Sequence, residues 1–109
     1  NEHLYMICLD KKRKLLNCSL LSEGGLGQVA VDLRSIVETA LRCSASCVVL
    51  AHNHTQGFAV PSRDDIQMTR QVARALQMVS VELIDHIVIS REEFVSMAST
   101  RGMWMEGSL

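Results

Sequence analysis

The first quarter of the chain contains two extended apolar segments separated by charge. An apolar run over residues 4–9 is followed by the charged residues 10–13 and by a second extended stretch over about 14–21. Two short segments joined by a polar turn predict a β-hairpin. The basic cluster Lys11–Lys14 then lies at a solvated hairpin tip, and we assign it no function. The glycine-rich stretch 23–28 predicts a loop and lacks the spacing of a phosphate-binding loop.

Two later segments have apolar residues at the spacing of one helix face. The first begins after Asp32, which can cap it, and runs to about Ser44. The second follows Pro61 and Ser62 and runs over about 63–79. The inward-facing apolar positions are Leu33, Ile36, Val37, Ala40 and Leu41 in the first segment and Ile66, Val72, Ala73, Leu76 and Val79 in the second. We therefore expect two amphipathic helices.

Two further segments indicate strands. The continuous apolar run 47–51 is typical of a central strand covered on both faces, and it leads directly into His52. Residues 82–90 are rich in β-branched and apolar residues and predict another strand. The tail that contains Phe94, Met97, Met103, Trp104 and Met105 has no assignable pattern. With 48% hydrophobic residues, the alternation of strands and helices predicts a single α/β domain over residues 1–109.

Charge and cysteine content narrow the class of protein. The formal net charge of -1 does not support nucleic-acid binding, which usually needs a basic surface. No apolar run approaches the roughly 20 residues that cross a bilayer, and the N-terminal residues lack a signal-peptide layout, so we expect a cytoplasmic protein without membrane attachment. Nothing indicates an oligomeric state. The absence of a CxxC pair favours reduced thiols over disulfides or a thiolate zinc site for Cys8, Cys18, Cys43 and Cys47.

The strongest chemical signal comes from two histidines and an aspartate. His52 and His54 are two positions apart, so on an extended backbone their side chains project to the same side. Asp65 follows a short loop later and can close on them. Two imidazoles and a carboxylate make a three-ligand metal site with a fourth position open for water, which is the arrangement of catalytic zinc. The pattern indicates a metal-dependent hydrolase.

Each of these residues also has an ordinary structural explanation. Ser62 and Asp65 have the spacing of a capping box that starts a helix. An isolated histidine at a strand end is more often structural or exposed than a ligand. The combination of all these residues at this spacing favours a metal site, and capping by Ser62 is compatible with it.

Two other patterns carry less weight. His52-Asn53-His54 spells the name of an endonuclease family, but those nucleases spread their three residues across a ββα-metal unit. Asp85 and His86 are adjacent and point to opposite faces of a strand, so we expect a structural or supporting role rather than a catalytic dyad.

The pattern His52-x-His54, seven residues, Ser62-x-x-Asp65 resembles the metal-binding signature of the JAMM metalloenzyme family. Further stretches resemble its bacterial RadC-like branch: Ala-His-Asn-His at 51–54, Pro61-Ser62-Arg63-x-Asp65 with Thr69, and Leu83-x-Asp85-His86-Ile87-x-Ile89. The similarity runs from about Glu2 to Gly102. It implies a JAMM/MPN-like (cytidine-deaminase-like) α/β fold, in which α-helices flank a mixed, curved β-sheet.

The resemblance also implies roles for single residues. His52, His54 and Asp65 would hold one Zn²⁺ ion per chain with water in the fourth position. Ser62 would donate a hydrogen bond to that water or to the oxyanion of a tetrahedral intermediate. Glu2 matches the family's general acid and base. The implied function is hydrolysis of an amide bond in a peptide or isopeptide, and the alternative is a DNA repair or replication accessory domain that binds metal without protease activity.

The sequence departs from the branch in its loops. Thr55-Gln56-Gly57 stands where the branch has Pro-Ser-Gly, and the usual Gly-Thr and Pro-Arg-Glu elements appear as Gly24-Gly25-Leu26-Gly27 and Asp32-Leu33-Arg34. These changes leave the metal ligands untouched and bear on loop shape and substrate preference.

Overall fold

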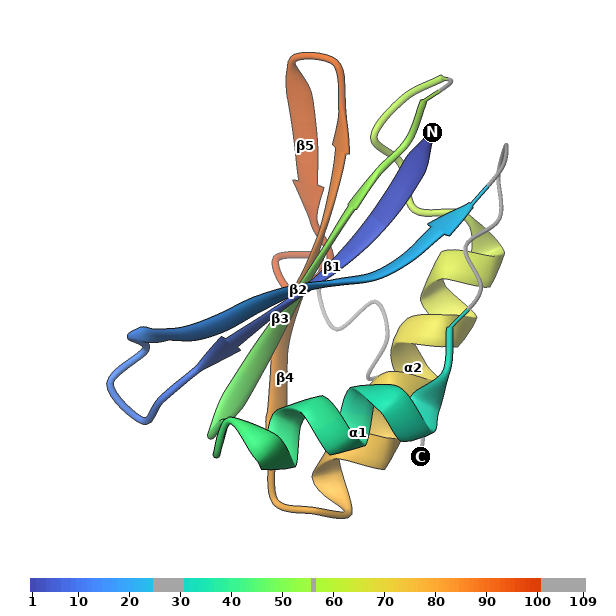
Figure 1. The fold of residues 1–109 in the computed structure, drawn as a ribbon. Coiled ribbons are helices and arrows are strands. Elements are labelled where there is room, and N and C mark those ends of the chain that lie inside the picture. Colours follow the sequence, from blue (N-terminus) through green and yellow to red (C-terminus); the bar gives the residue numbers. More distant parts are fainter. Residues whose placement is uncertain (25–30, 56, 101–109) are drawn as a thin grey trace.

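The computed structural model describes residues 1–24, 31–55 and 57–100, which form a β-sheet and two helices (Figure 1). The elements are, in chain order, β1 (Glu2–Leu9), β2 (Leu15–Gly24), α1 (Leu33–Arg42), β3 (Cys47–Asn53), α2 (Arg63–Gln77), β4 (Glu82–Ser90) and β5 (Glu93–Ser96). The expected α/β class is confirmed. Within the described residues, neither helix is long and apolar enough to span a membrane.

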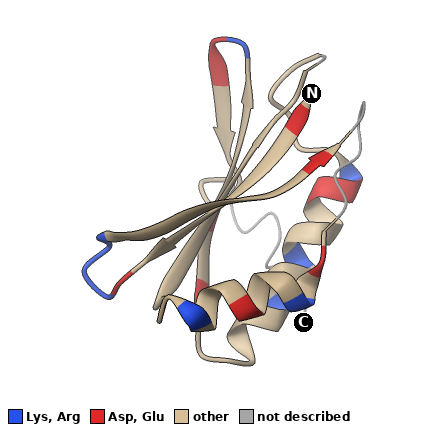
Figure 2. Cartoon of the chain, in the orientation of Figure 1, with Lys and Arg blue, Asp and Glu red and all other residues tan. Residues whose placement is uncertain are grey.

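The five strands form one mixed sheet in the order β2-β1-β3-β4-β5. β1 is antiparallel to β2 and β3, β3 is parallel to β4, and β5 is antiparallel to β4. The parallel pair needs a crossover connection, which contains α2. The predicted hairpin is present, and Asp10 closes its turn by accepting from the backbone N–H groups of Lys12 and Lys14. Figure 2 shows the basic residues at this tip, away from α2.

The core lies between the sheet and the helices, which cover the same face of the sheet (Figure 1). Alternate residues of β1 turn toward the helices and are fully buried, as the period of two along a strand requires. Ile36 of α1 and Leu76 of α2 meet them from the other side. The main buried apolar residues are Leu4, Met6, Cys8, Ile36, Ala40, Val48, Leu50, Val72, Leu76, Leu83, Val88 and Met97.

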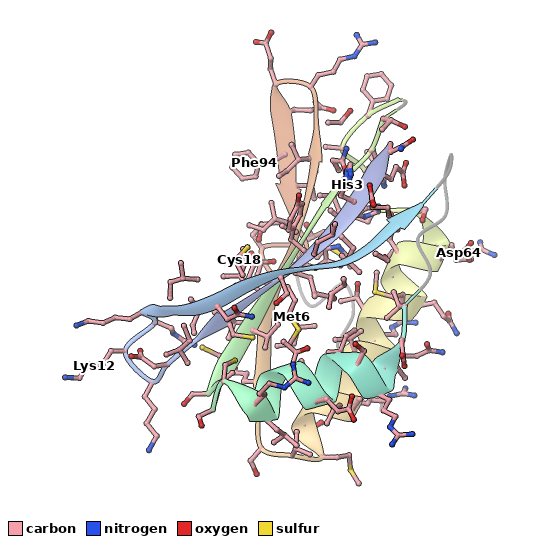
Figure 3. All side chains as sticks on the ribbon, in the orientation of Figure 1. His3, Met6, Lys12, Cys18, Asp64 and Phe94 are labelled. Carbon is pink, nitrogen blue, oxygen red and sulfur yellow. The ribbon has the colours of Figure 1, made fainter. Side chains whose placement is uncertain are left out.

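The opposite face of the sheet carries apolar side chains that the two helices do not cover. Figure 3 shows Met6 on the helix side of the sheet, and Cys18 and Phe94 on the other side. The prediction that the strand after residue 46 is covered on both faces is wrong for the described residues, because Val49 and Ala51 are only half-buried. The physical reason is that both helices pack on the face to which His52 points.

Both helices end earlier than their apolar spacing predicts. α1 ends at Arg42 and α2 ends at Gln77, two residues before the expected positions. Shortly after each end, a serine adopts the left-handed backbone region, with φ of 56° at Ser44 and 61° at Ser80. This conformation is incompatible with a continuing right-handed helix.

The strand boundaries also differ from the expectation in two places. β2 continues to Gly24, into the stretch whose glycines predict a loop, because residues 22–24 pair with the start of β1. β5 lies in the tail that has no assignable pattern. Residues 25–28 of the expected loop, and Met103, Trp104 and Met105 of the tail, lie outside the described residues.

Candidate metal centre

Strand pairing brings Glu2 and His52 to the same side of the sheet. Leu4 of β1 is the register partner of His52 of β3, and Glu2 precedes Leu4 by two residues, so all three side chains point toward the helices. Glu2 is 5% exposed and His52 is 2% exposed. The Oε1 atom of Glu2 lies 3.3 Å from Nε2 of His52. Glu2 is held in the sheet, because it pairs with Gly24 of β2 and the next residue, His3, donates its backbone N–H to Asn53 of β3.

His54 comes directly after β3 and is held through both its backbone and its ring. Its backbone N–H donates to the Ile89 carbonyl of β4 at 2.7 Å. Its Nδ1 lies 3.1 Å from the Phe58 carbonyl, and its Nε2 lies 2.9 Å from Oδ2 of Asp65. The ring meets that of His52 edge to face, with centroids 4.9 Å apart. The two imidazoles thus converge, as their spacing of two positions predicts.

Asp65 is the third residue of α2 and forms a capping box with Ser62. Ser62 Oγ accepts from the Asp65 backbone N–H at 3.0 Å, and Asp65 Oδ2 accepts from the Ser62 N–H at 2.8 Å. The same carboxylate faces both imidazoles, with Oδ1 3.6 Å from Nδ1 of His52. Ser62 and Asp65 therefore do form the capping box that their spacing predicts, and Asp65 contacts the two histidines at the same time.

One possible ligand atom from each of His52, His54 and Asp65 lies within 4.8 Å of the others. Among the described residues, no other group of three or more His, Cys, Asp or Glu side chains has the spacing of a metal site. The four cysteines are free and do not contribute to it. The structure brings together the predicted metal ligands, with Glu2 and Ser62 next to them.

The protonation states and charges of Glu2, His52, His54 and Asp65 are compatible with a bound cation. A neutral imidazole carries one N–H, yet both ring nitrogens of His54 face oxygen acceptors. His52 Nε2 faces Glu2, and its Nδ1 is buried without a hydrogen-bond partner among the described residues. Two carboxylates with two neutral imidazoles carry two negative charges, and a divalent cation balances this charge in a buried site. The residues present therefore fit a divalent metal.

The pKa values reflect the same contacts. Burial alone raises the pKa of Asp65, but the Ser62 N–H, His52 and His54 outweigh burial and hold it below its usual value. Burial alone lowers the pKa of His54, but the Phe58 carbonyl and the Asp65 carboxylate outweigh burial and raise it. Both shifts favour the charged forms, an aspartate anion and a histidine cation. A metal ion takes the place of the proton in such a pair.

Thr69 and His86 form a buried connection behind Asp65. The Thr69 hydroxyl donates to the Asp65 carbonyl at 2.6 Å, and it lies 2.6 Å from Nδ1 of His86. Burial and the nearby His52 lower the pKa of His86 to about 4, which keeps the ring neutral. Asp85 points elsewhere and accepts from Ser96 Oγ, so the two neighbours do not form a dyad. The supporting role expected of His86 stays a prediction, and its contact with Thr69 was not foreseen from the sequence.

Two residues of the β4–β5 hairpin hold the loop after His54. Glu93 Oε1 accepts from the Ala59 backbone N–H at 2.8 Å, and Ser90 Oγ donates to the Gly57 carbonyl at 2.9 Å. Sequence reasoning missed both residues, because neither belongs to a recognisable motif. The only signal available was their position, with Ser90 at the end of β4, the strand that pairs with β3, and Glu93 at the start of β5.

Comparison with known proteins agrees with this geometry. The family model described as RadC-like JAB domain matches residues 1–103. A UPF0758 protein of Bordetella avium is 41% identical over 102 residues, which are 94% of this chain and 45% of the relative. A UPF0758 protein of Bordetella parapertussis is 44% identical over 98 residues, which are 90% of this chain and 44% of the relative.

These relatives define the family but not its chemistry. The chain spans less than half the length of the relatives that it matches. Their names state no activity, metal or substrate. The sequence motifs, the mixed sheet and the group of His52, His54 and Asp65 nevertheless agree with the family model over nearly the whole chain. The chain belongs to the RadC-like JAB domain family.

Proposed function

We propose that this chain is a zinc-dependent hydrolase of amide bonds, with a peptide or isopeptide as its substrate. The observation that carries the proposal is the buried Glu2 carboxylate, 3.3 Å from a nitrogen of His52 and therefore beside the three possible ligands. Two imidazoles and one carboxylate are a ligand set of catalytic zinc. A carboxylate next to that set is positioned for proton transfer.

His52, His54 and Asp65 would hold a divalent ion, which would lower the pKa of water and polarise the carbonyl of the scissile amide. Glu2 accepts the proton of the attacking water as the new C–O bond forms. Glu2 then returns that proton to the amine nitrogen as the C–N bond breaks. Its low exposure keeps competing water away from this transfer.

Ser62 contributes a hydrogen-bond donor. Its Oγ accepts from the Asp65 N–H, so the hydroxyl hydrogen is not used in the capping box. The side chain is exposed at the N-terminus of α2, where a substrate can reach it. The hydroxyl is therefore able to donate to the oxyanion that develops on the substrate carbonyl.

The test is the substitution Glu2→Gln. The variant should keep one zinc per chain, measured by metal analysis of purified protein. It should lose about 10²- to 10⁴-fold in the cleavage of fluorogenic peptide and isopeptide amides, because the amide of Gln cannot accept the proton. Glu23→Gln, at an exposed glutamate of β2, is the matched control and should cleave like the wild type.

Two outcomes would contradict the proposal. Zinc-loaded wild type and Glu2→Gln that cleave equally well would exclude Glu2 as the proton carrier. Wild type that holds zinc and cleaves none of these amides would favour the alternative, an accessory domain that binds metal without protease activity. A DNA repair role predicts in addition salt-dependent DNA binding, which the net charge of -1 does not favour.

A further inference from the structure

The loop from His54 to Val60 connects β3 to the segment before α2 and carries the Phe58 carbonyl. This carbonyl lies 3.1 Å from Nδ1 of His54 and accepts its hydrogen. When Nδ1 donates in this way, a neutral His54 has its lone pair on Nε2, the nitrogen that faces Asp65. The position of one backbone carbonyl therefore sets which nitrogen of His54 is available as a ligand.

Of the described loop residues between His54 and Pro61, only Ala59 is buried. The loop contains no proline before Pro61, and Gly57 adopts φ of 79°, a left-handed conformation that glycine reaches without strain. Phe58 is exposed at 75%, so its side chain does not anchor the segment in the core. The described contacts that hold the loop in place come mainly from the neighbouring hairpin.

The β4–β5 hairpin contacts this loop at three points in succession. The His54 N–H donates to the Ile89 carbonyl at 2.7 Å. Ser90 Oγ donates to the Gly57 carbonyl at 2.9 Å, and Glu93 Oε1 accepts from the Ala59 N–H at 2.8 Å. The last two contacts lie immediately on either side of Phe58, and Ser90 is itself buried. Glu93 thus holds the peptide group that itself carries the Phe58 carbonyl, and Ser90 holds the peptide group before it.

We propose that Glu93 and Ser90 are positioning residues for the metal centre, which act on His54 through the Phe58 carbonyl. Their side-chain hydrogen bonds go to the loop backbone at Ala59 and Gly57. Their effect is to keep the carbonyl within reach of Nδ1, so that Nε2 keeps the lone pair that binds the ion. The inference rests on the metal site proposed above.

The experiment compares three variants of the full chain. Glu93→Ala removes the acceptor of the Ala59 N–H, Glu93→Gln restores an oxygen acceptor without charge, and Glu92→Ala changes the adjacent exposed glutamate of the hairpin turn. Zn²⁺ affinity is measured by competition with a chromophoric chelator. Glu93→Ala should bind about 10- to 100-fold more weakly, as is usual when a residue that orients a ligand is lost. Glu93→Gln and Glu92→Ala should stay within about threefold of the wild type.

Two readouts distinguish positioning from general stability. In ¹⁵N NMR spectra, the His54 Nδ1–H signal should be sharp in the wild type and broadened or lost in Glu93→Ala, while Glu93→Gln restores it. Amide exchange at Ala59 should follow the same order. An unchanged affinity and an unchanged His54 signal in folded Glu93→Ala would overturn the inference.

Failure of the metal proposal and failure of this inference are separable. If the wild type binds no Zn²⁺, the metal proposal fails, and the His54 Nδ1–H signal of the metal-free variants still decides the role of Glu93. If Glu93→Ala does not fold, the test is the protonation site of His54 in the zinc-loaded wild type. Protonation at Nε2 instead of Nδ1 of His54 in that sample would overturn the inference.

Discussion

Asp65 serves two purposes with one carboxylate. Its Oδ2 accepts from the Ser62 N–H in the capping box and also lies against His54, while Oδ1 faces His52. Sequence spacing predicts both the cap and the possible ligand, because each depends on the position of Asp65 relative to nearby residues. The placement of Glu2 is harder to foresee, because it depends on strand pairing and not on nearby residues. Its burial depends on the pairing of β1 with both β2 and β3, which is a long-range property.

The buried neutral state of His86 predicts a pH dependence of stability in the metal-free protein. Its pKa is about 4 in the folded chain, below the ordinary 6.5. Between these values the unfolded chain binds more protons, so this contribution to stability is complete above pH 6.5 and is lost as the pH falls toward 4. The loss amounts to about 3 kcal/mol.

Urea unfolding in the presence of a chelator, repeated from pH 7 to pH 4, measures this dependence. The variant His86→Gln, if folded, lacks the titrating group. The acid side of its plot of unfolding free energy against pH should therefore be flatter. His54, whose pKa is raised, acts in the opposite sense, because its contribution is lost as the pH rises above 6.5. Equal acid slopes for the wild type and His86→Gln would refute the assignment to His86.

At the scale of elements, the sequence predicts where strands and helices occur better than where they end. Apolar periodicity predicts both helices, because one face of each contributes to the core. Their ends are marked by Ser44 and Ser80 in the left-handed region, a position where glycine is the recognisable signal. β5 was missed because it has four residues, of which Phe94 is largely exposed. Such a strand has too little apolar patterning to detect.

The start of α2 yields a prediction that separates stability from turnover. Ser62→Ala removes the cap of the Asp65 N–H and should lower the free energy of unfolding by about 1 kcal/mol. It also removes the proposed donor to the oxyanion and should lower the rate by about 10²-fold. Ser62→Thr keeps a hydroxyl and should preserve most of both quantities. Thermal unfolding and amide cleavage are measured on the same samples, and a rate loss in Ser62→Ala no greater than that in Ser62→Thr would argue against the donor role.

At the scale of the molecule, the sequence predicts an α/β domain but not how its layers are arranged. Val49 and Ala51 are apolar on the face opposite to the buried Val48 and Leu50, so the sequence pattern indicates burial on both sides. In the described residues, α1 and α2 both cover the side to which His52 points (Figure 1). Apolar content shows that a surface is suited to burial, whereas the choice of covered face depends on the chain connections.

Metal binding should stabilise the whole molecule by linkage. Zn²⁺ at about 100 times its dissociation constant adds about 2.7 kcal/mol to the stability of the wild type. For a chain of this size, that raises the midpoint of thermal unfolding by roughly 10 °C. Calorimetry with and without the ion measures the shift.

Substitutions at adjacent aspartates give a matched control for this shift. Asp65→Ala should abolish it, because one of the three proposed ligands is lost. Asp64→Ala should keep it, because that side chain is exposed and points away from the sheet (Figure 3). A comparable shift in both variants would mean that zinc binds elsewhere.

The antiparallel pairing of β1 with β3 affects the order in which the contacts of the candidate site form during folding. His54 and Asp65 are 11 residues apart in sequence, whereas Glu2 and His52 are 50 apart. Local contacts form early in folding, and contacts between distant segments form late because closing a long loop costs more entropy. In a newly made chain we therefore expect His54 and Asp65 to meet before Glu2 reaches His52. The proposed hydrolysis, which needs Glu2, would then require the completed pairing of β1 with β3.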